Sequence, residues 1–109
     1  MPVPDDFFAL DIRIGTVVNA EPFPEARRSS IRLEIDFGAE LGRRRSSAQI
    51  TDHYAPEQLV GRQVVAVVNI GTRRIAGFTS EVLVLGGMTA GGVVLLAPDA
   101  AVPDGTRVG

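Results

Sequence analysis

The chain has 109 residues, a length that predicts one domain, and its 45% apolar and 22% charged residues are ordinary for a globular protein. It has no cysteine and a single histidine, which excludes a disulfide framework, a thiolate metal site and any multi-histidine site. The net charge is −2, and all eleven positive charges are arginine. Nucleic-acid binders usually carry a clear positive excess, so the overall balance argues against one.

The apolar runs and the acidic N-terminus predict where the protein works. The runs are much shorter than the roughly 20 residues that a membrane helix needs. The N-terminus carries Asp5 and Asp6 and shows no signal-peptide pattern. We therefore expect a cytoplasmic protein without membrane insertion.

A short helix is predicted at residues 4–10. Asp5 can cap it, and acidic side chains suit the positive end of the helix dipole. Its apolar face consists of Phe7, Phe8 and Leu10. Because one or two turns of helix are unstable alone, this face has to dock on another surface.

Strands are predicted from alternating polarity and from the turn signals between them. The expected strands are residues 11–20, 31–37, 43–49, 63–69, 73–76, 80–85, 93–97 and 106–108. Gly15 predicts a bulge or bend in the first strand, residues 38–42 a turn, and Pro56 and Gly61 the limits of a short helix before the fourth strand. Short strands, glycine turns and this helix indicate an all-β fold. The five-stranded OB-fold barrel matches best, with a short N-terminal helix and C-terminal extension strands, as one domain over residues 1–109.

The apolar residues exceed what such a barrel buries. The barrel does not need the apolar face of the N-terminal helix or the charge-poor segment after Gly86 for its own core. Exposed apolar β structure is an aggregation liability unless it is covered. A second copy related by a two-fold axis would cover it. We therefore predict a homodimer, with interface residues Phe7, Phe8, Leu10, Val93, Val94 and Leu95.

Residues 63–98 contain only three charges, which are Arg73, Arg74 and Glu81. A long segment whose few charges are grouped in its middle indicates a core that opens to solvent at one place. Apolar and amide groups at such an opening suit an extended peptide. The predicted peptide-binding residues are Ser46, Ser47, Gln49, Asn69, Arg73, Arg74, Ile75, Phe78 and Ser80. The alternative interpretation is that Ile75 and Phe78 belong to the core and that the arginines pair with acids.

The chain resembles the tRNA-binding domain family. Residues 8–15, FALDIRIG, match the F-x-x-L-D-I-R-V-G-type opening of that family, and the resemblance continues over nearly the whole chain. Residues 46–50 and 73–86 resemble the CsaA-type, secretion-related chaperone branch. This resemblance implies an OB-fold homodimer that binds unfolded or export-bound polypeptides without nucleotide hydrolysis. It also implies association with preproteins and the translocation ATPase, and no cofactor.

Structure-specific tRNA binding is the alternative function. Where the tRNA-binding branch tends to carry a lysine-rich signature and a serine-glycine pair, this sequence has residues 25–28, EARR, and Ser47-Ala48. Phe23 or Phe78 would stack on a base. The candidate phosphate contacts are Arg27, Arg28, Arg43, Arg44 and Arg45.

An enzyme is not expected. The sequence has no paired carboxylates in a recognisable motif, no phosphate-cradling loop between a strand and a helix, and no nucleophile at a familiar spacing from a base. No nucleophile is evident that His53 could activate, so we predict that it is a surface or capping residue. We therefore predict no catalytic and no metal-ligating residues.

Overall fold

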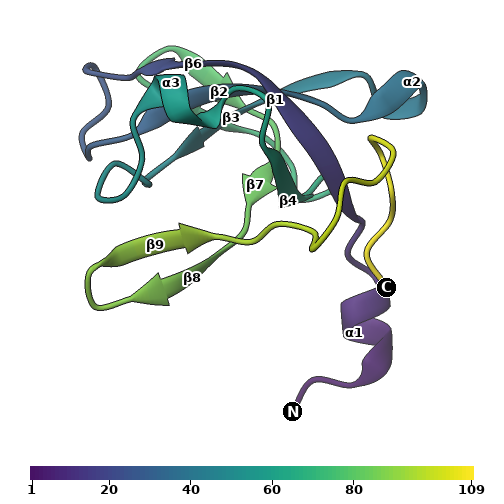
Figure 1. Cartoon of the computed structure of the whole chain (residues 1–109). Helices are drawn as coiled ribbons and strands as arrows, with labels where there is room; N and C mark the ends of the chain where they lie inside the picture. The colour runs from purple at the N-terminus through teal and green to yellow at the C-terminus, as the bar shows by residue number, and fades with distance from the viewer.

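Three short helices and nine strands follow one another along the chain, and the structure, a computed structural model, describes all of residues 1–109 (Figure 1). The helices are α1 (Pro4–Phe8), α2 (Gly38–Leu41) and α3 (Pro56–Leu59). The strands are β1 (Ile12–Pro22), β2 (Ile31–Asp36), β3 (Arg43–Ala48), β4 (Gln63–Val67), β5 (Arg73–Ile75), β6 (Phe78–Ser80), β7 (Leu83–Val84), β8 (Gly86–Thr89) and β9 (Gly92–Leu95).

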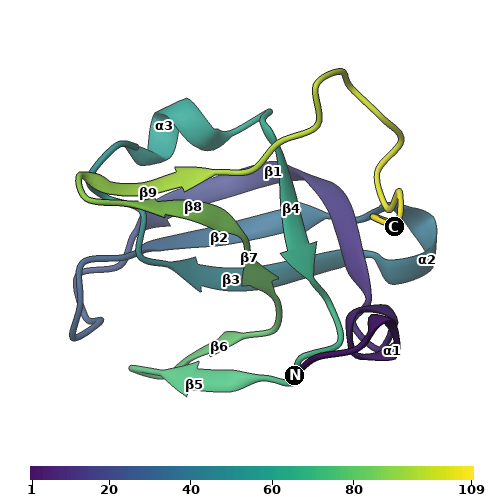
Figure 2. The same cartoon turned by 90° about the horizontal axis from the view of Figure 1, so that it is seen from below.

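Five strands form one antiparallel sheet in the order β3-β2-β1-β4-β7, which curls into a nearly closed barrel (Figures 1 and 2). The barrel closes where the chain between β6 and β7 runs beside β3. There the N–H of Glu81 donates to the carbonyl of Arg45 at 2.8 Å, and the hydroxyl of Ser46 donates to the carbonyl of Val82 at 3.0 Å. Since α3 lies between β3 and β4, the predicted OB-fold is confirmed.

The barrel core is built by the alternation that the sequence shows. Ile31, Leu33 and Ile35 of β2 point inward and are fully buried, whereas the charged residues between them are half-exposed. A second, smaller apolar cluster consists of Ile12, Ile14, Val65 and Val67 on β1 and β4, and the C-terminal segment packs against it. The predicted strand at residues 106–108 is reduced to a single bridge, between Arg13 and Arg107.

Arg13 fastens that C-terminal segment to β1. Its Nε donates to the carboxylate of Asp11 at 2.6 Å, and its Nη1 donates to the carbonyl of Gly105 at 3.1 Å. The hydrogen bond to Asp11 raises the pKa of Arg13 above its ordinary value, so the guanidinium stays charged. Asp11 and Arg13, which belong to the N-terminal motif that resembles the family, therefore have a structural role.

Gly15 permits close packing of β1 on β2. A Cβ at this position would lie 2.7 Å from side-chain carbons of Ile35 and Phe37, so no other residue fits without displacement. The register of β1 against β2 shifts elsewhere, between Val17 and Asn19. Of the two predictions for Gly15, the bulge is therefore wrong, and the bend stays a prediction.

Three further local predictions differ from the structure. Residues 38–42 include the short helix α2 rather than a simple turn. The continuous strand expected at residues 80–85 is broken between β6 and β7, because Glu81 and Val82 bond across to β3 instead. Asp6, not Asp5, makes the capping contact of α1, by accepting a hydrogen bond from the N–H of Val3 at 2.8 Å.

The hairpin β8–β9 and α1 both project from the same side of the barrel (Figures 1 and 2). No residue of α1 is buried, so the apolar face predicted for this helix stays uncovered within one chain. None of the three helices has the length and hydropathy needed to span a membrane.

Candidate functional site

A cleft of about 420 Å³ opens where the loop after β1 faces the end of β3 and the strands β5, β7, β8 and β9. We call it the arginine-rimmed cleft. Its lining residues are Ala26, Arg27, Arg28, Ser30, Ser47, Ala48, Gln49, Ile50, Arg73, Ile75, Leu83, Val84, Met88 and Val93. A smaller hollow of about 180 Å³ adjoins it and shares Ser47, Arg73, Ile75 and Leu83 with it. Strand β5 therefore stands between two connected depressions.

The charges of the cleft all have one sign. Arg27, Arg28 and Arg73 line it, and no aspartate or glutamate does. None of these three arginines takes part in any of the five ion pairs of the chain, and none of their guanidinium groups donates a hydrogen bond. Four arginines outside the cleft are ion-paired, namely Arg13, Arg32, Arg43 and Arg45, with Arg32 and Glu21 at 3.0 Å. The cleft thus brings together three arginines without an acidic partner, whereas the other arginines without one, Arg44, Arg62, Arg74 and Arg107, do not line it.

Five of the nine predicted peptide-binding residues lie at these two depressions. Ser47, Gln49, Arg73 and Ile75 line the cleft, and Ser80 lines the adjoining hollow. They come together because the hairpin β5–β6 folds back over the end of β3. The oxygen of Ser80 accepts a hydrogen bond from the N–H of Ser47 at 3.1 Å and so fastens that hairpin to β3.

The other four predicted residues lie outside the cleft. Ser46 is buried in the barrel seam, where its hydroxyl bonds to Val82. Asn69 bridges the start of β1, accepting from the N–H of Asp11 at 2.8 Å and donating to the carbonyl of Ala9 at 2.9 Å. Arg74 is exposed and approaches the hydroxyl of Thr79 at 3.5 Å, away from the cleft lining.

Phe78, the fourth, lies in a separate aromatic cluster on the outer face of the barrel. Its ring meets the ring of Phe23 edge-on, with centroids 5.4 Å apart. The guanidinium of Arg45 stands 5.0 Å from the centroid of Phe78, and that of Arg32 stands 5.1 Å from the centroid of Phe23. These contacts are cation–π interactions, and they hold the two arginines against the sheet. Phe78 therefore does not share a floor with Ile75.

The predicted tRNA-binding arginines divide into two groups. Arg27 and Arg28 lie at the cleft, as described above. Arg43 pairs with Glu34 at 3.7 Å and Arg45 with Glu81 at 3.8 Å, while Nε of Arg44 donates to a backbone carbonyl at 3.1 Å. Of the two proposed stacking aromatics, Phe23 is buried and Phe78 is half-buried. Two of the three arginines of β3 thus have an acidic partner.

The predicted dimer-interface residues lie in different parts of the structure. Phe7, Phe8 and Leu10 are exposed, with the two phenyl rings in edge contact at 5.4 Å. Val94 is exposed, whereas Val93 lines the cleft. Leu95 lines a third depression, which is described next.

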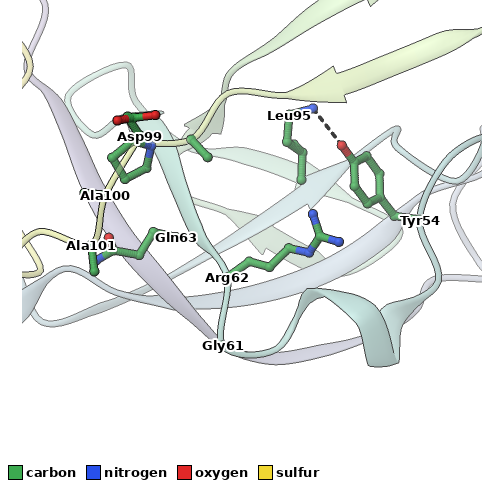
Figure 3. A pocket seen from close by; sticks show the side chains of 10 residues that line it. Tyr54, Gly61, Arg62, Gln63, Leu95, Asp99, Ala100 and Ala101 are labelled. Carbon is green, nitrogen blue, oxygen red and sulfur yellow. Dashed lines mark hydrogen bonds between the residues drawn. The ribbon is translucent and has the colours of Figure 1, made fainter.

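A hollow of about 340 Å³ lies between the corner joining α3 to β4 and the segment after β9 (Figure 3). In it the hydroxyl oxygen of Tyr54 accepts a hydrogen bond from the N–H of Leu95 at 3.0 Å. The guanidinium of Arg62 lies 5.5 Å from the centroid of the Tyr54 ring. This hollow contains none of the predicted peptide-binding residues, but its Tyr54–Leu95 bond holds the hairpin that borders the cleft.

Sequence reasoning missed the residues that complete the cleft. Leu83, Val84 and Met88 line it, although the sequence predicts only that the first two lie in a strand. The side chain of Met88 is 90% exposed, which is unusual for so large an apolar group. The signal available in the sequence was a methionine in a glycine-rich, charge-free segment.

Comparison with known proteins identifies the family. Residues 12–107 match the model of the family described as "Putative tRNA binding domain". The chain belongs to the tRNA-binding domain family. The predicted resemblance is therefore confirmed, and within the family the chain is CsaA-like.

Two solved structures match over the whole chain. The chaperone CsaA from Bacillus anthracis str. Ames is 58% identical, with a TM-score of 0.91, over 100% of this chain and 99% of that one. The CsaA chaperone protein from Picrophilus torridus is 42% identical, with a TM-score of 0.94, over 100% of both chains.

Among curated proteins, the match is to one part of a longer chain. The methionine–tRNA ligase of Porphyromonas gingivalis (strain ATCC 33277) is 41% identical over 105 residues, which is 95% of this chain and 15% of the ligase. The chain thus spans about 15% of the length of the curated relatives it matches.

Proposed function

We propose that this chain is a non-catalytic chaperone that binds extended polypeptides and acts as a homodimer in the cytoplasm. The observation that carries the proposal is the arginine-rimmed cleft, which joins an apolar floor to unpaired hydrogen-bond donors. The similarity to structures of CsaA chaperones over the full chain supports it. Export-bound preproteins and the translocation ATPase, implied by the same resemblance, are the partners that we propose for testing.

The cleft has the size and surface that a peptide side chain requires. Its volume of about 420 Å³ falls within the roughly 300–1,000 Å³ usual for ligand sites. Burial of apolar peptide surface on Ile75, Leu83 and Met88 would contribute about 25 cal/mol per Å², before the costs of association. The side chains of Ser47 and Gln49 donate no hydrogen bond within the chain, so they are free to bond a peptide backbone.

The homodimer is proposed because the exposed apolar residues lie on elements that project together. Phe7 and Phe8 on α1 and Val94 on β9 are uncovered, and both elements leave the same side of the barrel (Figures 1 and 2). A two-fold contact through this side would bury them. It would also join two clefts in one particle, and a polypeptide that engages both would gain avidity.

The proposal is tested by a double substitution at the wall between the two depressions. Arg73→Glu with Ile75→Ser should abolish suppression of aggregation of an unfolded client and lower peptide affinity at least about tenfold, because it reverses a charge and removes the apolar contact. Arg74→Glu is the matched control, since this neighbouring side chain lines neither depression. Equal losses in both variants, with both still folded by circular dichroism, would contradict the cleft as the binding site.

tRNA binding is the second candidate, favoured by the family match and by the unpaired Arg27 and Arg28. A complex held by several phosphate contacts should weaken by orders of magnitude between low and moderate salt, whereas one held by apolar contacts changes little. Titration of tRNA and of an unfolded polypeptide at two salt concentrations separates the two functions. Binding of tRNA alone at physiological salt would contradict the chaperone proposal.

A further inference from the structure

We propose that the arginine-rimmed cleft selects extended polypeptide segments in which apolar residues are flanked by aspartate or glutamate, and that it discriminates against segments flanked by lysine or arginine. The inference deepens the proposed function and rests on it. It assigns to the cleft a ligand class that the overall net charge of −2 would not indicate.

The first reason is that the local charge has one sign. Arg27 and Arg28 come from the loop after β1 and Arg73 comes from β5, so two separate segments bring three positive charges to one depression. No carboxylate lines the cleft or its adjoining hollow. A basic side chain entering the cleft would meet only like charge, and such contacts are a common means by which a site rejects wrong partners.

The second reason is that these guanidinium groups are unoccupied. Each guanidinium has five N–H donors, and those of Arg27, Arg28 and Arg73 make no ion pair or side-chain hydrogen bond within the chain. Arginine donors match the two oxygens of a carboxylate and form a bidentate pair with it. Arg32 and Arg43 are different, because Glu21 and Glu34 already pair with them.

The third reason is that the apolar lining of the cleft is aliphatic. Ile75, Leu83, Met88 and Val93 line the cleft, and no aromatic side chain does. Nucleobases in single strands stack chiefly on aromatic rings, and here the candidate ring, Phe78, already contacts Phe23 and Arg45. Between the two anionic polymers, the cleft therefore fits an acidic, apolar polypeptide better than RNA.

The test compares three short labelled peptides with blocked termini. They share one aliphatic core and carry two aspartates, two asparagines or two lysines on each side of it. Fluorescence anisotropy with the full chain should rank the affinities in the order aspartate, asparagine, lysine. The first and last should differ about tenfold at low ionic strength, because each exposed charge contact contributes only a small factor. The difference should shrink as salt is added.

Matched variants test whether the cleft arginines cause the charge preference. Arg27→Gln and Arg73→Gln should each reduce the aspartate-to-lysine ratio about two- to fivefold while leaving the asparagine peptide nearly unchanged. Arg107→Gln removes the same charge from a position outside the cleft and should leave the ratio intact.

The remaining outcomes overturn the inference in distinguishable ways. Equal affinity for all three peptides would end the charge selection but leave the proposed chaperone function standing. No binding of any peptide would end both. Displacement of the aspartate peptide by a short single-stranded RNA at physiological salt would assign the arginines to nucleic acid. Loss of peptide binding as the chain self-associates would assign the cleft to a second copy.

Discussion

The hydroxyl oxygen of Tyr54 accepts a hydrogen bond at 3.0 Å from the backbone N–H of Leu95, and this bond fastens the β8–β9 hairpin to the barrel (Figure 3). The hairpin carries Met88 and Val93, which line the arginine-rimmed cleft. A residue in a different hollow thus holds part of the wall of the cleft in place.

Tyr54→Phe should lower the free energy of unfolding by about 0.5–1.5 kcal/mol, the usual contribution of one such hydrogen bond. The phenyl ring still packs beneath Arg62, so the loss is confined to the hydroxyl. Hydrogen exchange at the amide of Leu95 should accelerate, and peptide affinity should fall because the hairpin is less firmly held. Unchanged exchange at that amide would contradict the bond.

Two adjacent glycines in β8 provide a matched pair. A Cβ on Gly86 would lie 2.6 Å from Cγ1 of Val93 and 2.9 Å from the carbonyl oxygen of Val94, whereas one on Gly87 would meet nothing closer than 3.8 Å. Gly86→Ala should therefore destabilise the protein by about 1–3 kcal/mol through overpacking, and Gly87→Ala should be nearly neutral. Urea unfolding of both variants measures the difference, and equal midpoints would show that the hairpin does not pack as described.

The barrel was predictable because its signal lies within single strands. The alternation around Ile31, Leu33 and Ile35 fixes which face of β2 is buried. The break after Ser80 was not predictable, because Glu81 bonds to the backbone of Arg45, which is distant in the sequence. A local pattern cannot reveal a pairing that depends on how the barrel closes.

The cleft was predictable in part for the same reason. Arg73 and Ile75 stood out because their surroundings lack charge, and the structure places both at the cleft. Phe78 pairs directly with Ile75 in the β5–β6 hairpin, yet its ring packs with Phe23 from another loop. The sequence pattern predicts Arg27 as a tRNA-binding residue. Only the folded chain shows that Arg27 lies at the same depression as Arg73 and has no acidic partner.

Asn69 was predicted as a peptide-binding residue, and its contacts favour a different role. Its side chain bonds both the N–H of Asp11 and the carbonyl of Ala9, which join α1 to β1. Asn69→Ala should lower the free energy of unfolding by about 1–2 kcal/mol, for two lost hydrogen bonds, and leave intrinsic peptide affinity unchanged. Thermal unfolding and peptide titration of the same preparation measure both. A selective loss of affinity without loss of stability would instead place Asn69 at the bound peptide.

Phe8 provides the test of the proposed homodimer. It is 61% exposed, and its only aromatic contact is the edge-on ring of Phe7 within the same helix. If a second copy covers this face, Phe8→Ser removes buried apolar area from both protomers and should raise the dimer dissociation constant about tenfold or more. Sedimentation equilibrium over a range of concentrations measures the shift. The control is Val60→Ser, which removes a similarly exposed apolar side chain just after α3, outside the predicted interface residues. A monomeric parent chain, or a Phe8 variant that dimerises as tightly as the parent, would remove α1 from the interface.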